Sequence, residues 1–112
     1  MIALLQRVEK ARIIVDGKEI ASIGNGLLIL VGIKTSDTSV DADYLAKKIL
    51  GLRIFNDQEG KMNISVTDTG GEILVVSQFT LLGDCRKGRR PDYIQAATPT
   101  VAKSLSITLN LV

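Results

Sequence analysis

The 112-residue sequence has no histidine and a single cysteine, Cys85. Without histidine there is no imidazole base, so Ser-His and Cys-His nucleophile pairs are excluded. A zinc site would need a shell made of carboxylates, and we therefore expect neither a metal nor a cofactor. The lone cysteine excludes an intrachain disulfide, which fits a cytoplasmic location. Catalysis would have to use backbone amides, hydroxyls, carboxylates, lysine, arginine or a group of the substrate.

Phosphate-loop motifs and membrane spans are also missing. The ten glycines form neither a Walker A pattern nor GxGxxG. No apolar run approaches the roughly 18 residues of a membrane helix. The net charge is only +2, so any basic footprint for nucleic acid must be local. We expect neither a membrane nor DNA as partner, and we interpret residues 1–112 as one globular domain.

The apolar pattern predicts an α/β fold with a mixed sheet, an N-terminal hairpin and two helices. Expected strands and extended pieces are Ile2–Val8, Ala11–Val15, Glu19–Ile23, Leu27–Ile33, Arg53–Phe55, Lys61–Val66, Glu72–Leu82 and Ser106–Val112. Asp16-Gly17 is typical of a tight hairpin turn. The run Leu27–Ile33 is apolar enough for a central strand that is buried on both faces.

Apolar residues at helical spacing predict a helix from Val40 to Leu50, with Asp37 or Ser39 as its N-cap. Thr98-Pro99 predicts the start of a second helix, because proline is favoured at the first helical position. In the extended piece Lys61–Val66, we expect the apolar side chains to share one face.

The most unusual stretch is Gly70–Pro91, an apolar strand that turns polar and ends in a basic loop. Period two would place Ser77 and Phe79 on one face, and Gln78 and Thr80 on the other. These polar residues are either merely tolerated in a strand, or they present hydroxyls and N–H groups to a substrate carbonyl.

The loop after this strand carries Arg86, Lys87, Arg89 and Arg90. The four cations form either a solvated surface or a patch for nucleic-acid phosphates. Phe79 and Tyr93 either belong to the core or offer stacking surfaces to a nucleobase.

Several segments together resemble one family. They are MIALLQRV, the hairpin with VDG, GNGLLILVGI, DADYLAKKIL with LRIF, GKMN, and GGEILVVSQFTL followed by RKGRRP. Over about Met1 to Leu105 the chain resembles the D-aminoacyl-tRNA deacylases, also called D-tyrosyl-tRNA deacylases. The resemblance implies a three-layer α/β/β fold and a homodimer. It implies hydrolysis of the ester between a D-amino acid, or glycine, and the 3′-terminal adenosine of tRNA, a proofreading step in translation.

The resemblance also implies roles for individual residues. Catalysis would fall to Ser77, Gln78, Phe79 and Thr80, substrate binding to Phe79, Leu81, Met62 and Asn63, and tRNA binding to Arg86, Lys87, Arg89 and Arg90. Thr80 is a nucleophile in one account. In the other, backbone amides around Phe79 and Thr80 stabilise the oxyanion and the adenosine 2′-hydroxyl assists. The lack of histidine favours the second account.

The C-terminal end departs from the family pattern. The family carries a Gly-Pro motif that reaches into the partner subunit and excludes L-amino acids, whereas this sequence contains no Gly-Pro. We therefore expect a deacylase fold with a shortened or altered C-terminus. An active deacylase is the leading hypothesis. The alternatives are a catalytically impaired module that binds tRNA or protein, and an editing domain like those attached to some threonyl-tRNA synthetases.

Overall fold

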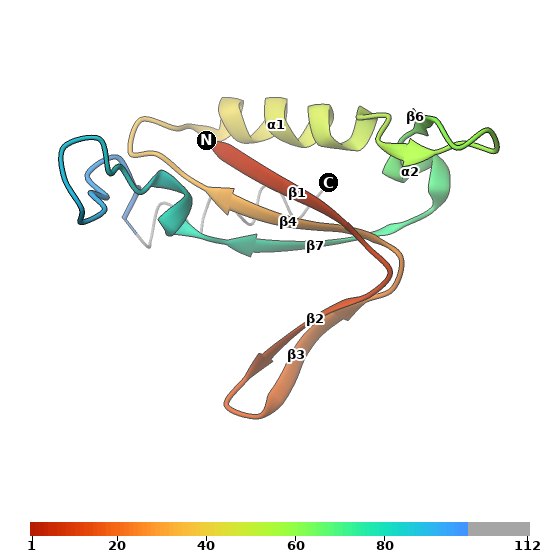
Figure 1. Ribbon diagram of the computed structural model, residues 1–112, viewed down its shortest axis with the longest axis horizontal. Helices are drawn as coiled ribbons and strands as arrows, with labels where there is room; N and C mark the ends of the chain where they lie inside the picture. Colours follow the sequence, from red (N-terminus) through yellow and green to blue (C-terminus); the bar gives the residue numbers. More distant parts are fainter. Residues whose placement is uncertain (99–112) are drawn as a thin grey trace. The chain divides into compact units, whose positions relative to one another are not determined.

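A computed structural model describes residues 1–98 as a mixed α/β fold (Figure 1). Its strands are β1 (Ile2–Val8), β2 (Ala11–Val15), β3 (Lys18–Ile23), β4 (Gly26–Gly32), β5 (Phe55–Asn56), β6 (Met62–Ile64) and β7 (Glu72–Ser77). Its helices are α1 (Ser39–Gly51) and α2 (Val66–Thr69), with a 3₁₀ turn η1 (Phe79–Leu82). The expected first four strands and the expected helix are confirmed. The helix predicted from Thr98-Pro99 and the strand Ser106–Val112 lie outside the described residues.

Strands β1, β4 and β7 form a three-stranded sheet with β4 at its centre. In Figure 1, β4 and β7 point the same way and β1 points the opposite way, which makes the sheet mixed. The central strand is buried at five of its seven positions, and the other two are half-buried. This pattern confirms the prediction of a central strand that is covered on both faces.

The hairpin β2–β3 is antiparallel and turns at Asp16-Gly17. Both turn residues have positive φ, 51° and 78°. A type I′ turn requires this at its two central positions, and its twist matches that of the flanking strands. The Asp-Gly prediction is therefore confirmed.

The chain divides into two compact units. The first contains Met1–Leu4, Leu30–Ala46 and the chain from Val75 onward. Its buried apolar residues are Val31, Ile33, Ala42, Ala46 and Leu82. The second contains Leu5–Ile29 and Lys47–Leu74, and it buries Leu27, Ile29, Ile49, Val66 and Leu74. The interpretation of residues 1–112 as a single domain stays a prediction.

The N-cap of α1 is Thr38, so the prediction of Asp37 or Ser39 is wrong. Thr38 Oγ1 accepts from the amide of Val40 at 3.3 Å, and the Thr38 amide donates to Asp41 Oδ2 at 2.8 Å. This reciprocal pair is a capping box with aspartate in place of glutamate. Asp37 is instead engaged by the amino group of Met1 at 2.8 Å and by the Lys34 amide at 2.7 Å.

The segment after β6 folds into α2, which the sequence-based expectation of an extended piece to Val66 missed. Ser65 is buried and its Oγ accepts from the Asp68 amide at 3.2 Å, which begins the helix. Val66 is then buried, whereas Met62 is 63% exposed. The expected shared apolar face is therefore wrong, because the helix turns Val66 away from the alternation of the strand.

Candidate active site

Strand β7 ends at Ser77, five residues before the predicted end at Leu82, so the period-two prediction for its C-terminal half is wrong. The Gln78 amide still donates to Val31 O of β4 at 2.7 Å. The chain then turns through η1, where the Leu81 amide donates to Gln78 O at 3.3 Å. The turn buries Leu82, which is only 6% exposed.

Gly32 at the end of β4 makes this turn possible. A Cβ atom at position 32 would lie 3.0 Å from the Leu81 Cβ and 3.4 Å from the Gln78 carbonyl oxygen. The missing side chain lets η1 pack directly against the central strand. The sequence alone does not indicate why position 32 is glycine, because the residues that pack against it lie almost fifty positions later in the chain.

The predicted catalytic residues run from the end of β7 into the 3₁₀ turn η1. Ser77, Phe79 and Thr80 are exposed, and Gln78 is half-buried. The Gln78 side-chain Nε2 donates a hydrogen bond to Thr80 Oγ1. The first amides of a helical turn have no partner within the turn, and within residues 1–98 no side chain caps those of η1. Within residues 1–98 the N–H groups of Phe79 and Thr80 have no recorded hydrogen-bond acceptor.

Phe79 and Tyr93 lie side by side, a contact that the sequence did not predict. Their ring centroids are 5.1 Å apart and the ring planes meet at 68°, an edge-to-face arrangement. Phe79 is 58% exposed, and the alternative that it is a core residue is therefore wrong.

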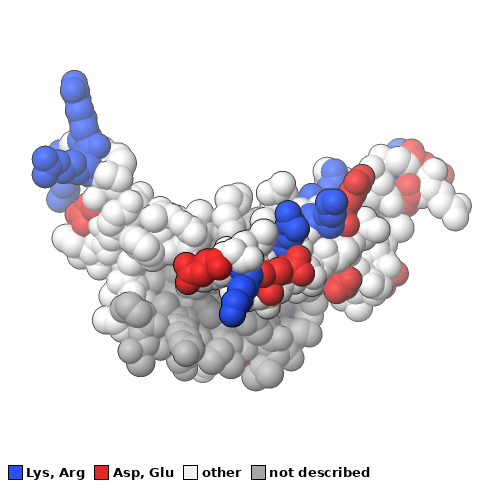
Figure 2. Space-filling model, turned by 90° about the horizontal axis from the view of Figure 1, so that it is seen from below, with Lys and Arg blue, Asp and Glu red and all other residues white. Residues whose placement is uncertain are grey.

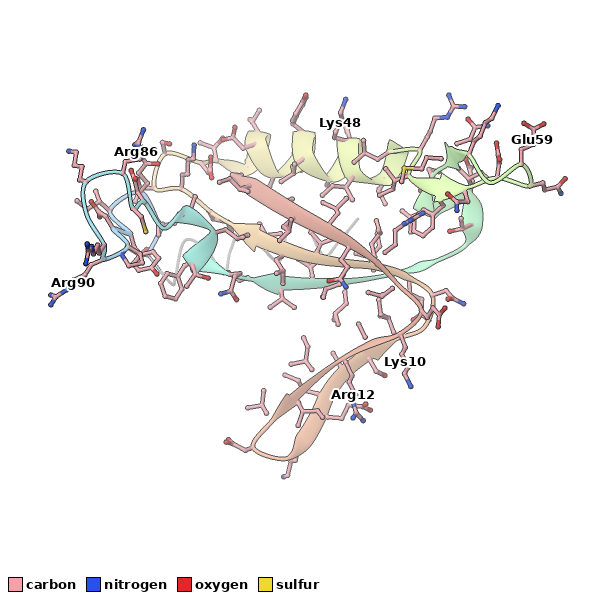
Figure 3. The ribbon with its side chains drawn as sticks, viewed as in Figure 1. Lys10, Arg12, Lys48, Glu59, Arg86 and Arg90 are labelled. Carbon is pink, nitrogen blue, oxygen red and sulfur yellow. The ribbon has the colours of Figure 1, made fainter. Side chains whose placement is uncertain are left out.

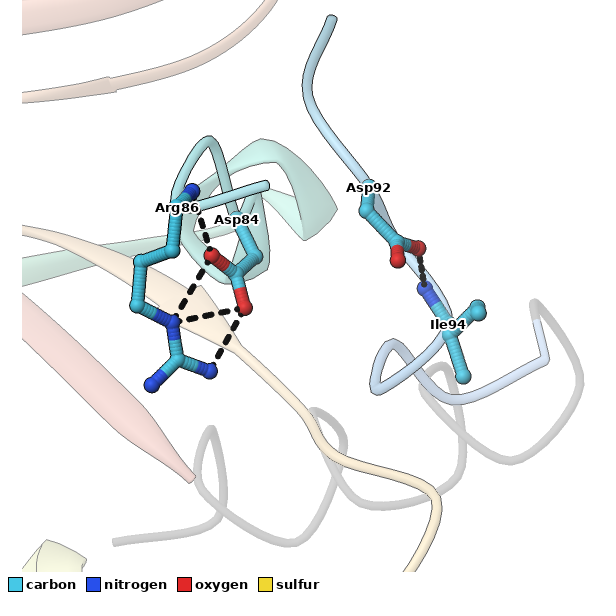
Figure 4. Close-up of polar contacts among 4 residues, drawn as sticks. All are labelled: Asp84, Arg86, Asp92 and Ile94. Carbon is cyan, nitrogen blue, oxygen red and sulfur yellow. Dashed lines mark hydrogen bonds and ion pairs between the residues drawn. The ribbon is translucent and has the colours of Figure 1, made fainter. Parts of the chain in front are cut away.

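The basic loop is closed at its base by two backbone hydrogen bonds. Asp84 and Asp92 each donate an amide to the other's carbonyl, both at 2.9 Å. The Arg86 guanidinium forms an ion pair with the Asp84 carboxylate at 2.7 Å (Figure 4). Hydrogen bonds from Arg86 lower the pKa of Asp84 to about 2, and the same carboxylate raises the pKa of Arg86.

The other three cations of the loop, Lys87, Arg89 and Arg90, are exposed. Within the described part of the chain none of them forms an ion pair. Figure 2 shows Lys and Arg side chains gathered at the left, where this loop lies, and Figure 3 shows Arg90 pointing outward. The structure therefore separates Arg86, which is held by its own loop, from three exposed cations that form no ion pair within residues 1–98.

An open depression of about 520 Å³ lies beside the loop. Its lining includes Leu81, Cys85 and Arg86 together with Lys34 and Gln95. One predicted substrate contact and one predicted tRNA contact thus border the same hollow. Asp84 and Asp92, which shape the loop, were missed as contributors, although an aspartate at each end of a basic stretch is a usable signal for a closed loop.

Met62 and Asn63 belong to the second unit, where they form part of β6. The Asn63 amide group donates to Asp57 Oδ2 at 3.3 Å, and its backbone oxygen accepts from Arg53 Nε at 3.0 Å. Arg53 Nη2 also donates to Asn63 Oδ1. These bonds place the Asn63 side chain within its own hairpin, and its contact with substrate stays a prediction.

No three His, Cys, Asp or Glu side chains gather as a cation site among residues 1–98. In the same range, neither helix is long and apolar enough to cross a bilayer.

Comparisons with known proteins agree with this architecture. A family model described as D-Tyr-tRNA(Tyr) deacylase matches residues 4–110. Proteins named D-aminoacyl-tRNA deacylase from Desulfatibacillum aliphaticivorans and Heliobacterium modesticaldum are 58% and 59% identical over 105 residues. The match covers 94% of this chain in both cases, with 72% and 70% of the two relatives.

Solved structures are similar as well. One described as c-Myc DNA Unwinding Element Binding Protein has a TM-score of 0.88 at 40% sequence identity, over 96% of this chain and 72% of that chain. Another, described as a probable eukaryotic D-amino acid tRNA deacylase, has a TM-score of 0.79 at 21% identity and supports the fold alone. The family match spans nearly the whole sequence, and the fold agrees with it. The chain belongs to the D-Tyr-tRNA(Tyr) deacylase family.

Proposed function

We infer that this protein is a D-aminoacyl-tRNA deacylase, an ester hydrolase that releases the D-amino acid and free tRNA. The observation that carries this function is family membership, since relatives at 53–59% identity bear that name. The reaction removes wrongly charged D-amino acids and is a proofreading step in translation. Nothing in the comparisons favours the impaired binding module or the synthetase-attached editing domain.

We propose that the backbone amides of Phe79 and Thr80 form the oxyanion site. Water attacks the ester carbonyl carbon, and the carbonyl oxygen becomes an oxyanion that accepts from these two N–H groups. The bond between this carbon and the adenosine 3′-oxygen then breaks, and a proton originating from the water reaches the leaving oxygen. Two preorganised donors aimed at developing charge account for a large rate term without a side-chain base.

In this proposal Thr80 positions the turn and is not the nucleophile. The Thr80 hydroxyl oxygen accepts a hydrogen bond from Gln78 Nε2. Gln78 is therefore a donor to Thr80 and not a base that could remove the hydroxyl proton. Thr80→Val tests the point because valine keeps the shape and loses the hydroxyl. A positioning role predicts a fall in kcat/KM of about tenfold or less. A nucleophile role predicts a loss of about a thousandfold or more.

We propose that tRNA phosphates contact Lys87, Arg89 and Arg90, with a smaller share for the ion-paired Arg86. Leu81, Met62 and Asn63 remain proposed substrate contacts.

A homodimer is supported by exposed apolar side chains such as Leu4, which is 54% exposed on β1. Light scattering on the purified protein measures the oligomer mass, and a monomer mass at all concentrations contradicts the dimer. We propose a cytoplasmic location, and fractionation of cells tests it.

The decisive experiment is release of labelled tyrosine from D-tyrosyl-tRNA by purified protein, beside the Desulfatibacillum relative as positive control. We expect release above the buffer rate, and L-tyrosyl-tRNA in parallel reports the chiral preference. Binding of D-tyrosyl-tRNA without release, while the relative is active, contradicts the enzyme and supports the non-catalytic module.

A further inference from the structure

The Phe79–Tyr93 pair joins the proposed catalytic turn to the end of the basic loop. Phe79 belongs to η1, and its ring projects from the surface with more than half of its area exposed. Among exposed side chains such a ring would sample several rotamers, and ordering it on binding would cost affinity. The edge of Tyr93 against it, at 5.1 Å between centroids, limits that freedom.

Tyr93 is itself held by the loop that precedes it. Asp92 exchanges two backbone hydrogen bonds with Asp84, so the chain enters Tyr93 at a fixed point. The Tyr93 carbonyl then accepts from the Ala96 amide at 2.9 Å. The ring also lies close to Gly83, where an added Cβ would be 3.1 Å from Tyr93 Cε1. Backbone hydrogen bonds therefore hold the chain on both sides of Tyr93 in the sequence.

We propose that Tyr93 is a positioning residue of this deacylase, which holds the Phe79 ring in the orientation that the aminoacylated 3′ end of tRNA meets. The proposal rests on the deacylase function and adds a residue to it. Tyr93 acts through Phe79 by packing, and the aromatic ring, not the hydroxyl, is the group required. Because the closed loop sets the place of Tyr93, the phosphate-binding loop and the catalytic turn form one connected frame.

Kinetics of three variants test the proposal on D-tyrosyl-tRNA. Tyr93→Ala raises KM about two- to tenfold and leaves kcat within about twofold, since binding is lost equally in ground and transition states. Tyr93→Phe keeps the unmodified KM. Tyr44→Ala is the matched control, because Tyr44 is the only other tyrosine and is exposed on α1. A fall in kcat at unchanged KM indicates fewer folded molecules and overturns the proposal. A Tyr93→Phe defect as large as that of Tyr93→Ala also overturns it.

A glycine pair provides a second perturbation that leaves both rings intact. Gly83→Ala places a methyl group 3.1 Å from both Tyr93 Cε1 and the Thr80 carbonyl oxygen. It therefore strains the contact between the Tyr93 ring and the turn that carries Phe79, and it is expected to raise KM in the same direction as Tyr93→Ala. Gly88→Ala, in the same loop, meets nothing within 4 Å and is expected to change nothing. Equal effects of the two alanines contradict the proposal.

A spectroscopic readout separates this inference from the deacylase function itself. In ¹³C-labelled protein, the Phe79 ring signals, identified by their loss in Phe79→Leu, shift when Tyr93→Leu removes the neighbouring ring current. Unshifted Phe79 signals overturn the contact. If the unmodified protein releases no tyrosine, the deacylase proposal fails. In that case the dissociation constant for D-tyrosyl-tRNA is measured in place of KM. Tyr93→Ala is then expected to weaken binding while Tyr93→Phe and Tyr44→Ala do not, and a Tyr93→Phe defect as large as that of Tyr93→Ala overturns the proposal.

Discussion

Two loops of this molecule, residues 57–61 and 84–92, each begin with an aspartate and differ in their charge. Asp57 Oδ1 accepts from the amides of Glu59 and Lys61 at 2.9 and 3.0 Å. Asp84 Oδ1 accepts from the Arg86 amide at 3.0 Å. Both are turns in which an aspartate side chain binds the backbone that follows, and both are closed by backbone hydrogen bonds.

The difference lies in the partner of the second carboxylate oxygen and in the charge that remains. In the first loop this oxygen accepts from the Asn63 amide, and the loop has two acids and one lysine. In the second it accepts from the Arg86 guanidinium, and the loop has four cations against two acids. The first loop satisfies its aspartate carboxylate internally, whereas the second displays three cations that form no ion pair within residues 1–98.

The largest expected effect comes from removing the free cations of the second loop. Arg89→Ala with Arg90→Ala raises KM for D-tyrosyl-tRNA about tenfold at low salt, because two phosphate contacts are lost. The slope of log affinity against log salt falls by about 1.4–1.8. Lys10→Ala with Arg12→Ala is the matched control, since these two cations are exposed on another part of the chain (Figure 3). An unchanged slope in the first variant would place the phosphate contacts elsewhere.

An intermediate effect is expected in the first loop. Asp57→Ala removes the acceptor of two backbone amides and lowers the melting temperature by roughly 3 °C. The slope of log affinity against log salt stays unchanged, because the cations that we propose as phosphate contacts lie in the second loop. Glu59→Ala is the control, since its pair with Lys61 is long at 3.9 Å and exposed, and its melting temperature should match the unmodified protein. Thermal unfolding and kinetics on both variants check the assignment, and a loss of activity in Asp57→Ala without a change in melting temperature contradicts it.

The smallest expected effect is a change in the pKa of the Asp84 carboxyl that the Asp57 carboxyl does not share. The folded-state pKa of Asp84 is lowered to about 2 from 3.8, so its contribution to stability is complete above about pH 4 and is lost as the pH falls toward 2. The pKa of Asp57 is lowered too, mainly by the hydrogen bond from the Lys61 backbone. Arg86→Ala returns the Asp84 midpoint toward its usual value and leaves Asp57 unchanged, as followed by NMR of the carboxyl carbons. A shift of both carboxylates, or of neither, argues against the ion pair.

Local chemistry made much of the fold predictable. Asp16-Gly17 suits a turn with two positive φ values, and the run in β4 is too apolar for any place except the centre of a sheet. The end of β7 was not predictable, because Phe79 and Thr80 favour strands by themselves. That preference is overridden because Leu82 is buried against Gly32 of β4. The cap of α1 was misplaced for a related reason, since Asp37 is recruited by the distant amino group of Met1.

For the candidate site, the sequence by itself determined the residue types: the polar SQFT segment, the cluster of cations and the absence of histidine. Only the tertiary structure decided that the segment is an exposed turn and that Phe79 meets Tyr93. The physical reason is that turn, strand and charge preferences act over a few neighbouring residues. Contacts between rings or between a turn and a strand depend on the backbone path that brings separated segments together.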